Sequence, residues 1–268
     1  MNISRCKDIL YSLKKYIFAA KFQILKRVNL VIDIGNTCAK LVVFDGYNVV
    51  EEVRVDKGEW FLLEDLCSRY DFTKGICSTV AGIDKDAERI MSSLPFDIMF
   101  FESGKTPVPV VSSYKTPLTL GADRLAAVVG ANWLQPDADV LVIDIGTCIT
   151  FDFINAAGVY EGGNISLGPT MRLRALHEFT ARLPLVERKG ETTLLGQTTE
   201  TSIRNGVVFG IKYEIEGYIK QMLEKHPRLF VYLTGGVHMD LHFSERIHIF
   251  ANNFIVPIGL NRILEYNQ

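Results

Sequence analysis

Short apolar runs and helical periodicities alternate along this chain. Runs rich in β-branched residues predict strands over the following segments: 30–34, 40–44, 75–80, 97–101, 141–145, 149–154 and 229–233. Apolar positions at helical spacing predict helices over 60–70, 84–93, 125–133, 172–182 and 198–223. Strands and helices mixed at this density imply α/β layers in each half of the chain.

The chain contains an internal repeat. The sequence LVIDIG occurs at Leu30–Gly35 and again, 111 residues later, at Leu141–Gly146. Each copy is a strand that ends in Asp-x-Gly and is followed by a second strand, which is the pattern of a hairpin. The repeat predicts a first domain over 29–136 and a second over 137–268, with a boundary near Gln135–Asp137 and a separate extension over 1–28.

The N-terminal extension has its own charge pattern. Residues 1–27 contain seven Lys and Arg against one Asp, a net charge of +6, which leaves −8 on the rest of the chain. Leu10, Leu13, Ile17 and Ile24 recur at helical spacing beside this basic face, so a helix on a membrane surface is one interpretation. The lysines argue against a secretory signal. A second hypothesis is that translation starts at Val28, which the intact mass of the native protein would test.

Composition narrows the class of protein. The 268 residues are 48% hydrophobic and 22% charged with a net charge of −2, which indicates a globular protein whose partner is a small molecule rather than a nucleic acid. The five cysteines lack zinc spacing, and His238 and His242 follow a glycine turn, so we expect neither a zinc site nor a disulfide framework. No apolar run predicts an integral membrane segment, and we expect a cytoplasmic protein.

The first repeated turn carries groups that bind phosphate. Asp33, Gly35 and Thr37 offer a carboxylate, free backbone N–H groups and a hydroxyl, and Lys40 follows. Such a bend can hold phosphate oxygens while the carboxylate orients a hydrated Mg²⁺ ion. An ordinary polar hairpin is the alternative for one copy, but two equivalent turns favour a nucleotide held between them. Neither a Walker nor a Rossmann pattern follows the strand.

The order of the turns and four further motifs resemble a known family. Asp33-x-Gly, Asp144-x-Gly and Thr234-Gly235-Gly236 are similar to the actin-like ATPase superfamily, which includes acetate and sugar kinases. Within it the chain resembles type III pantothenate kinases from about residue 29 to near its end. The motifs are Tyr114-x-x-Pro117-x-x-x-Gly121-Ala122-Asp123-Arg124, Gly162-Gly163-Asn164-Ile165, Thr180-Ala181-Arg182-Leu183-Pro184 and Gly196-Gln197-Thr198-Thr199.

This resemblance implies a fold, an activity and a set of residues. The fold would be α/β, with two ribonuclease-H-like domains and ATP in the cleft between them. The enzyme would phosphorylate pantothenate with ATP and Mg²⁺, the first step of coenzyme A biosynthesis, and would be a homodimer. The residues implied to bind ATP are Asp33, Ile34, Gly35, Asn36, Thr37, Cys38, Ala39, Lys40 and Thr147. Those implied to line the pantothenate pocket are Tyr114, Gly121, Ala122, Asp123, Arg124 and Thr199.

Two aspartates receive specific roles by the same resemblance. Asp144 would coordinate a monovalent cation, K⁺ or NH₄⁺, and Asp123 would be the proton acceptor. Leu167 stands where the family commonly has proline, which is a departure. An ionised carboxylate suits proton transfer, and Arg124 suits pairing with an anion. The alternative is that Asp123 caps a helix and Arg124 forms a surface ion pair.

Three other functions remain open at this point. The first is a kinase of the same superfamily acting on another hydroxyl, such as that of a sugar. The second is a nucleotide-dependent interaction protein, as among chaperone or filament members. The third is a regulatory relative without catalysis. The segment from Tyr114 to Arg124 argues against the first, the short second half against the second, and the intact Asp123 against the third.

Overall fold

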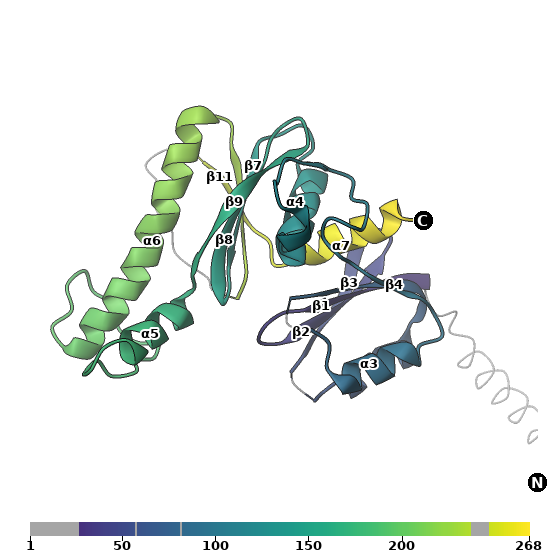
Figure 1. Ribbon diagram of the computed structural model, residues 1–268, viewed down its shortest axis with the longest axis horizontal. Helices are drawn as coiled ribbons and strands as arrows, with labels where there is room; N and C mark the ends of the chain where they lie inside the picture. Colours follow the sequence, from purple (N-terminus) through teal and green to yellow (C-terminus); the bar gives the residue numbers. More distant parts are fainter. Residues whose placement is uncertain (1–26, 57, 81, 237–246) are drawn as a thin grey trace, which may run out of the picture.

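The computed structural model, which describes residues 27–56, 58–80, 82–236 and 247–268, contains two β-sheets (Figure 1). The first sheet has the order β3-β2-β1-β4-β5. Strands β1 to β3 are antiparallel neighbours, whereas β4 and β5 run parallel to β1. Their bounds are β1 Arg27–Ile34, β2 Ala39–Asp45, β3 Asn48–Val55, β4 Asp71–Thr79 and β5 Ile98–Phe100.

The second sheet repeats this topology. Its order is β11-β10-β7-β8-β9-β6, so that β9-β8-β7-β10-β11 corresponds strand for strand to the first sheet. The extra strand β6 pairs with the edge of β9. The bounds are β6 Val111–Ser112, β7 Val140–Ile145, β8 Cys148–Ile154, β9 Val159–Leu167, β10 Phe230–Thr234 and β11 His248–Ala251. The two sheets therefore confirm the expected duplication.

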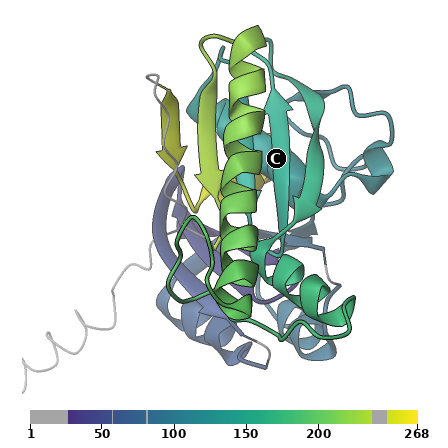
Figure 2. The same ribbon diagram turned by 90° about the vertical axis from the view of Figure 1, so that its left-hand side faces the viewer.

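Helices form three layers around the sheets. Helices α4 and α7 lie between the two sheets, and their apolar side chains share one core with inner-face residues such as Val31 and Val142 (Figure 1). Helices α2 and α3 cover the outer face of the first sheet. Helix α6 runs along the outer face of the second sheet, with α5 near its start (Figure 2). The bounds are α2 Phe61–Arg69, α3 Lys85–Ser92, η1 Pro117–Thr119, α4 Ala122–Leu134, α5 Pro169–Glu178, α6 Thr199–Lys225 and α7 Ile255–Tyr266.

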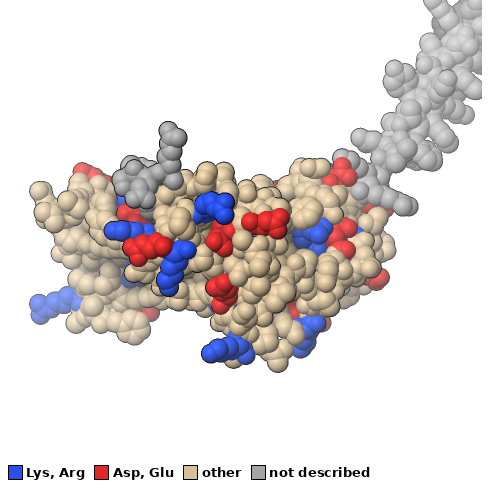
Figure 3. Space-filling model, turned by 90° about the horizontal axis from the view of Figure 1, so that it is seen from above, with Lys and Arg blue, Asp and Glu red and all other residues tan. Residues whose placement is uncertain are grey.

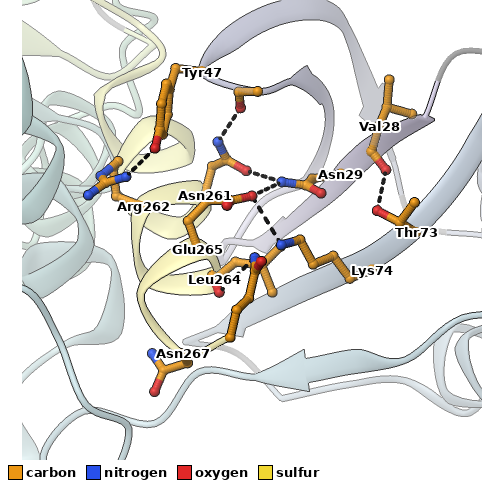
Figure 4. Close-up of polar contacts among 12 residues, drawn as sticks. Val28, Asn29, Tyr47, Thr73, Lys74, Asn261, Arg262, Leu264, Glu265 and Asn267 are labelled. Atoms are coloured by element: carbon orange, nitrogen blue, oxygen red, sulfur yellow. Dashed lines mark hydrogen bonds and ion pairs between the residues drawn. The ribbon is translucent and has the colours of Figure 1, made fainter.

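The C-terminal helix is attached to the first sheet by polar contacts. Asn261 on α7 accepts a hydrogen bond from Asn29 Nδ2 at 3.0 Å and donates one to the Gly46 carbonyl at 2.8 Å (Figure 4). Glu265, one turn further along, is 3.1 Å from Lys74 Nζ. Because these contacts join residues more than 190 positions apart in the sequence, they fix α7 to the opposite half of the chain.

Every helix and strand expected from the sequence pattern is present, with ends shifted by a few residues. The short strand β6 joins the second sheet although it precedes α4, and α7 contacts β1 and β4 of the first sheet. We still propose the domain boundary near residues 135–137, with β6 and α7 as elements that reach across it. Residues 1–26, together with His238 and His242, lie outside the described residues. None of the described helices combines the length and apolar character needed to cross a bilayer.

Candidate active site

Both repeated aspartates lie where a strand turns into its hairpin partner. Asp33 ends β1 opposite Lys40 on β2, and Asp144 occupies the same place on β7 opposite Thr150. Each turn is closed by one backbone hydrogen bond, from Gly35 N to the carbonyl of residue 38 at 3.1 Å and from Gly146 N to that of residue 148 at 2.9 Å. The two hairpins are equivalent parts of two equivalent sheets.

Strand alternation directs both carboxylates toward the layer between the sheets. Successive side chains on a strand point to opposite faces. Val31 and Val142 pack with α4 on the inner face, and Asp33 and Asp144 each follow two residues later. Both aspartates therefore lie on the inner faces of their sheets, on the side occupied by α4.

The third glycine turn borders the second aspartate. Thr234, at the end of β10, pairs with Asp144. Gly235 has φ +97°, and a Cβ there would lie 2.5 Å from the Ile145 carbonyl oxygen and 2.6 Å from Asp144 Oδ1. Glycine is required because both the backbone angle and the space exclude a side chain. The second and third turns therefore lie side by side at the ends of neighbouring strands.

Asp123 lies in the first turn of α4. Its Oδ1 accepts a hydrogen bond from the Arg124 backbone N–H at 2.8 Å, so the carboxylate lies at the positive end of the helix. Its negative charge is close enough to raise the pKa of both Asp33 and Asp144. The third carboxylate thus lies in the same region as the two turns.

The electrostatics around the two repeated aspartates favour the binding of a cation. Burial is the main cause that raises the pKa of Asp33 to about 6; the charge of Lys40 opposes this shift, and the charges of Asp123 and Asp144 add to it. Burial likewise raises the pKa of Asp144 to about 6, with Asp123 as the next cause. Burial and neighbouring negative charges disfavour the ionised form of both carboxyl groups. A bound cation would stabilise that ionised form.

The side chains near the two turns fit a metal ion, such as Mg²⁺, that takes most of its ligands from phosphate and water. The Ser78 hydroxyl, on β4 beside Asp33, is buried and has no hydrogen-bond partner among the described residues. Within the same described part of the chain, no three His, Cys, Asp or Glu side chains are grouped to hold a metal. Mg²⁺ bound to a nucleotide commonly uses one or two carboxylates, phosphates and water, so this site fits it.

Replacing Asp33 with asparagine is expected to stabilise the protein without ligands at pH 7 by about 1–3 kcal/mol. The carboxyl has a pKa of 3.8 unfolded and about 6 folded, so the folded state binds the proton more tightly. The stability of the native sequence therefore falls as the pH rises from about 4 to 6.

Thermal unfolding at pH 4 and pH 7 measures this effect, with Asp97→Asn, an exposed position, as control. We expect the gain from Asp33→Asn at pH 7 and little gain at pH 4. An equal change at both pH values would contradict the account of Asp33.

The remaining residues implied for ATP surround the first turn. Asn36 and Thr37 are exposed at its tip, and Thr147 is exposed in the second turn, whereas Ile34 and Ala39 are buried in strands. A cavity of about 390 Å³ adjoins the first turn, and the residues that line it include Ile34 to Ala39 together with Trp60 and Asp84. The first turn therefore borders a cavity.

The residues implied for pantothenate fall into two groups. Tyr114, Gly121, Ala122, Asp123 and Arg124 lie together at the start of α4. Thr199 is exposed at the start of α6, which covers the outer face of the second sheet. Within one chain the structure thus places Thr199 and Asp123 on opposite faces of that sheet.

Arg124 has a partner that sequence reasoning missed. Its guanidinium is buried and forms an ion pair with Asp152 at 2.7 Å, and the Tyr160 hydroxyl donates to the same carboxylate at 2.7 Å. The ion pair is therefore internal, unlike the surface pair considered as an alternative. The available signal was the single charged residue within the apolar strand Ile149–Ile154.

His177 and Leu167, two positions noted in the sequence, have local hydrogen-bond partners. His177 lies on α5 and its Nδ1 is 2.8 Å from the Leu183 carbonyl oxygen. Leu167 ends β9, and its carbonyl accepts a hydrogen bond from Arg172 Nε at 2.8 Å. Gly168 follows, and a Cβ there would lie 2.2 Å from the Thr147 carbonyl oxygen, so glycine is required beside the second turn.

Comparisons with known proteins agree with this geometry. A family model for type III pantothenate kinase matches residues 29–221. A type III pantothenate kinase of Phocaeicola vulgatus is 50% identical over 241 residues, which cover 90% of this chain and 99% of that protein.

Solved structures share the fold at low identity. A Sinorhizobium meliloti protein described as a 2-dehydro-3-deoxygalactonokinase has a TM-score of 0.56 at 13% identity, covering 89% of this chain and 98% of that one. A Campylobacter jejuni protein described as a Baf family transcriptional activator has a TM-score of 0.54 at 20% identity over the same shares. These likenesses confirm the expected fold class, and the match over most of the sequence shows that this chain belongs to the type III pantothenate kinase family.

Proposed function

We infer that this chain transfers the terminal phosphoryl group of ATP to the hydroxyl of pantothenate. The products are ADP and 4′-phosphopantothenate, and the reaction opens coenzyme A biosynthesis. The observation that carries the proposal is the placement of Asp123 beside two equivalent aspartate turns, in a chain of this family. Phosphoryl transfer depends mainly on positioning and charge neutralisation, which such a site can provide.

The two turns hold the nucleotide. The stretch from Asp33 to Lys40 and the hydroxyl of Thr147 bind the phosphates, because backbone N–H groups, hydroxyls and an ammonium group all donate to phosphate oxygens. Asp33 orients hydrated Mg²⁺, and Asp144 coordinates K⁺ or NH₄⁺. When bound, these cations neutralise the negative charge that the phosphates add to the site.

Asp123 accepts the proton of the acceptor alcohol. As the hydroxyl oxygen forms its bond to phosphorus and ADP leaves, the proton moves from that oxygen to the carboxylate. The backbone N–H of Arg124 donates to Asp123 Oδ1 at 2.8 Å and holds this carboxylate at the start of α4. Tyr114 and the backbone of Gly121 and Ala122 line the pantothenate side of the site.

A homodimer would complete the pantothenate site. Large apolar side chains between α5 and α6 are exposed, by 84% at Phe179, 72% at Leu194 and 80% at Leu195. Apolar surface of this kind is typical of protein interfaces. Because Thr199 and Asp123 lie on opposite faces of the second sheet, two copies offer the simpler way for both to contact one pantothenate molecule.

Replacing Leu195 with aspartate is expected to weaken the dimer, because the charge would be buried at the interface. We expect a shift toward monomer in analytical ultracentrifugation. We also expect a rise of about tenfold in KM for pantothenate, with ATP affinity unchanged, since only the pantothenate site uses both copies. Phe61→Asp, at an exposed position on α2, is the control. A variant that stays dimeric or keeps its KM would contradict this arrangement.

Turnover of the purified protein tests the proposed function. With Mg²⁺, K⁺ and ATP, ADP release is expected only when pantothenate is present. Release that depends on a sugar would favour a different kinase, and release without any acceptor would favour a nucleotide-driven interaction protein. Activity that is unchanged in buffer stripped of monovalent cations would contradict the role of Asp144.

We also propose that the partner of this protein is a small molecule and that the protein is cytoplasmic. Acidic and basic side chains are intermixed on the face seen in Figure 3, whereas nucleic-acid binding uses extended basic surfaces. ATP as a substrate, together with free cysteines at the four described cysteine positions, is typical of a reducing compartment.

A further inference from the structure

A carboxylate lies buried in the middle of the second sheet. Asp152 on β8 is 1% exposed and faces α4, since its neighbours Phe151 and Phe153 point to the outer face. It accepts hydrogen bonds from Arg124 Nη2 at 2.7 Å and Nε at 3.0 Å, and from the Tyr160 hydroxyl at 2.7 Å. Such a charge is tolerated in a core only when it is paired and hydrogen-bonded in this way.

The glycine motif on β9 provides the space for this ion pair. Gly163 pairs directly with Asp152 across the two strands. A Cβ on Gly163 would lie 2.6 Å from Asp152 Oδ1 and 2.8 Å from Arg124 Nη2. Because any side chain would displace the pair, the Gly162-Gly163 motif and the Asp123-Arg124 motif belong to one structural unit.

The same structural unit reaches Asp123 and Tyr114, the two residues that we place next to the acceptor alcohol. Arg124 directly follows Asp123 in the first turn of α4, so fixing its guanidinium fixes that turn. The ring of Tyr160 stacks on that of Tyr114, with centroids 5.9 Å apart and an angle of 13°. The Arg124 guanidinium carbon lies 5.8 Å from the centre of the same Tyr114 ring. Asp152 thus holds, through two different side chains, the base and one wall of the acceptor pocket.

We propose that Asp152 is a positioning residue for the phosphoryl transfer, acting through Arg124 on Asp123 and through Tyr160 on Tyr114. The inference rests on the proposed function. Arg124 directs its Nε and Nη2 atoms to Asp152, and this ion pair fixes the side chain next to the base. Groups that act in catalysis need neighbours that lock their side chains, and a buried ion pair with a satisfied carboxylate provides this.

Tyr160→Phe is the decisive variant. Asp152→Asn leaves Arg124 incompletely paired in a buried site and therefore risks unfolding. Phenylalanine keeps the ring that stacks on Tyr114 and removes only the hydroxyl that donates to Asp152. We expect kcat/KM for pantothenate to fall about tenfold or more, the range for one hydrogen bond to a charged group. The fall should include a higher KM for pantothenate, with the ATP dissociation constant unchanged.

Tyr232→Phe is the matched control, because Tyr232 is a second buried tyrosine of the same core whose hydroxyl contacts Gln135 at the far end of α4. It should retain the native kcat/KM. A Tyr160→Phe enzyme that matches this control overturns the inference. So does one whose KM for pantothenate and whose kcat per ATP-binding site are both native, because a purely structural role lowers only the amount of active enzyme. Absence of pantothenate-dependent turnover in the unmodified protein instead contradicts the proposed function.

Discussion

Asparagine in place of Asp123 is expected to lower kcat for pantothenate by a factor of about 10²–10⁴, the range for removal of a general base. The amide has nearly the same shape, and its oxygen can still accept the Arg124 N–H, so the start of α4 should be preserved. An amide cannot take a proton from an alcohol near neutral pH. The loss should therefore appear in turnover, whereas ATP binding, which uses the two turns, should persist.

Rapid-quench or coupled assays of ADP release give kcat, and calorimetry gives the ATP dissociation constant. Asp86→Asn is a matched control, because Asp86 lies at the corresponding position in the first turn of α3, which covers the outer face of the first sheet. It should leave kcat unchanged. If Asp123→Asn kept more than a tenth of the native kcat, proton transfer to Asp123 would not be part of the rate-determining chemistry.

The repeat made half of this architecture predictable. Six identical residues at Leu30 and Leu141 predicted two equivalent hairpins, and the strand order of the two sheets is indeed the same. Strand alternation could also have placed Asp33 and Asp144 on one face, because it depends only on local periodicity. The two turns could be predicted from the sequence because the residues that provide their polar groups are neighbours along the chain.

Contacts made between distant segments were not predictable in the same way. The partner of Arg124 depends on how α4 lies against β8, and no local pattern specifies that placement. Asp152 was visible only as a charge in an apolar strand. Helix α7 was missed altogether, although Asn261 and Glu265 join it to the first sheet (Figure 4). Its role depends on long-range packing rather than on a motif.

Two glycines allow the helices of the central layer to touch backbone to backbone. A Cβ on Gly259 of α7 would lie 1.8 Å from the Ala126 carbonyl oxygen on α4. One on Gly130 would lie 2.1 Å from the Ile255 carbonyl oxygen. Neither obstacle is a flexible side chain, so an added methyl group must push the helices apart. The contacts of Asn261 and Glu265 with the first sheet oppose such a movement of α7.

Gly259→Ala is therefore expected to lower the free energy of unfolding by about 3 kcal/mol, the upper part of the range for overpacking a core. Gly217→Ala, in α6 where a Cβ meets open space, should raise it by about 0.5–1 kcal/mol through helix propensity alone. Urea denaturation measures both. Equal stabilisation by the two changes would show that α4 and α7 can separate without cost. Since α4 carries Asp123, we expect the destabilised variant also to lose pantothenate turnover at temperatures where it remains folded.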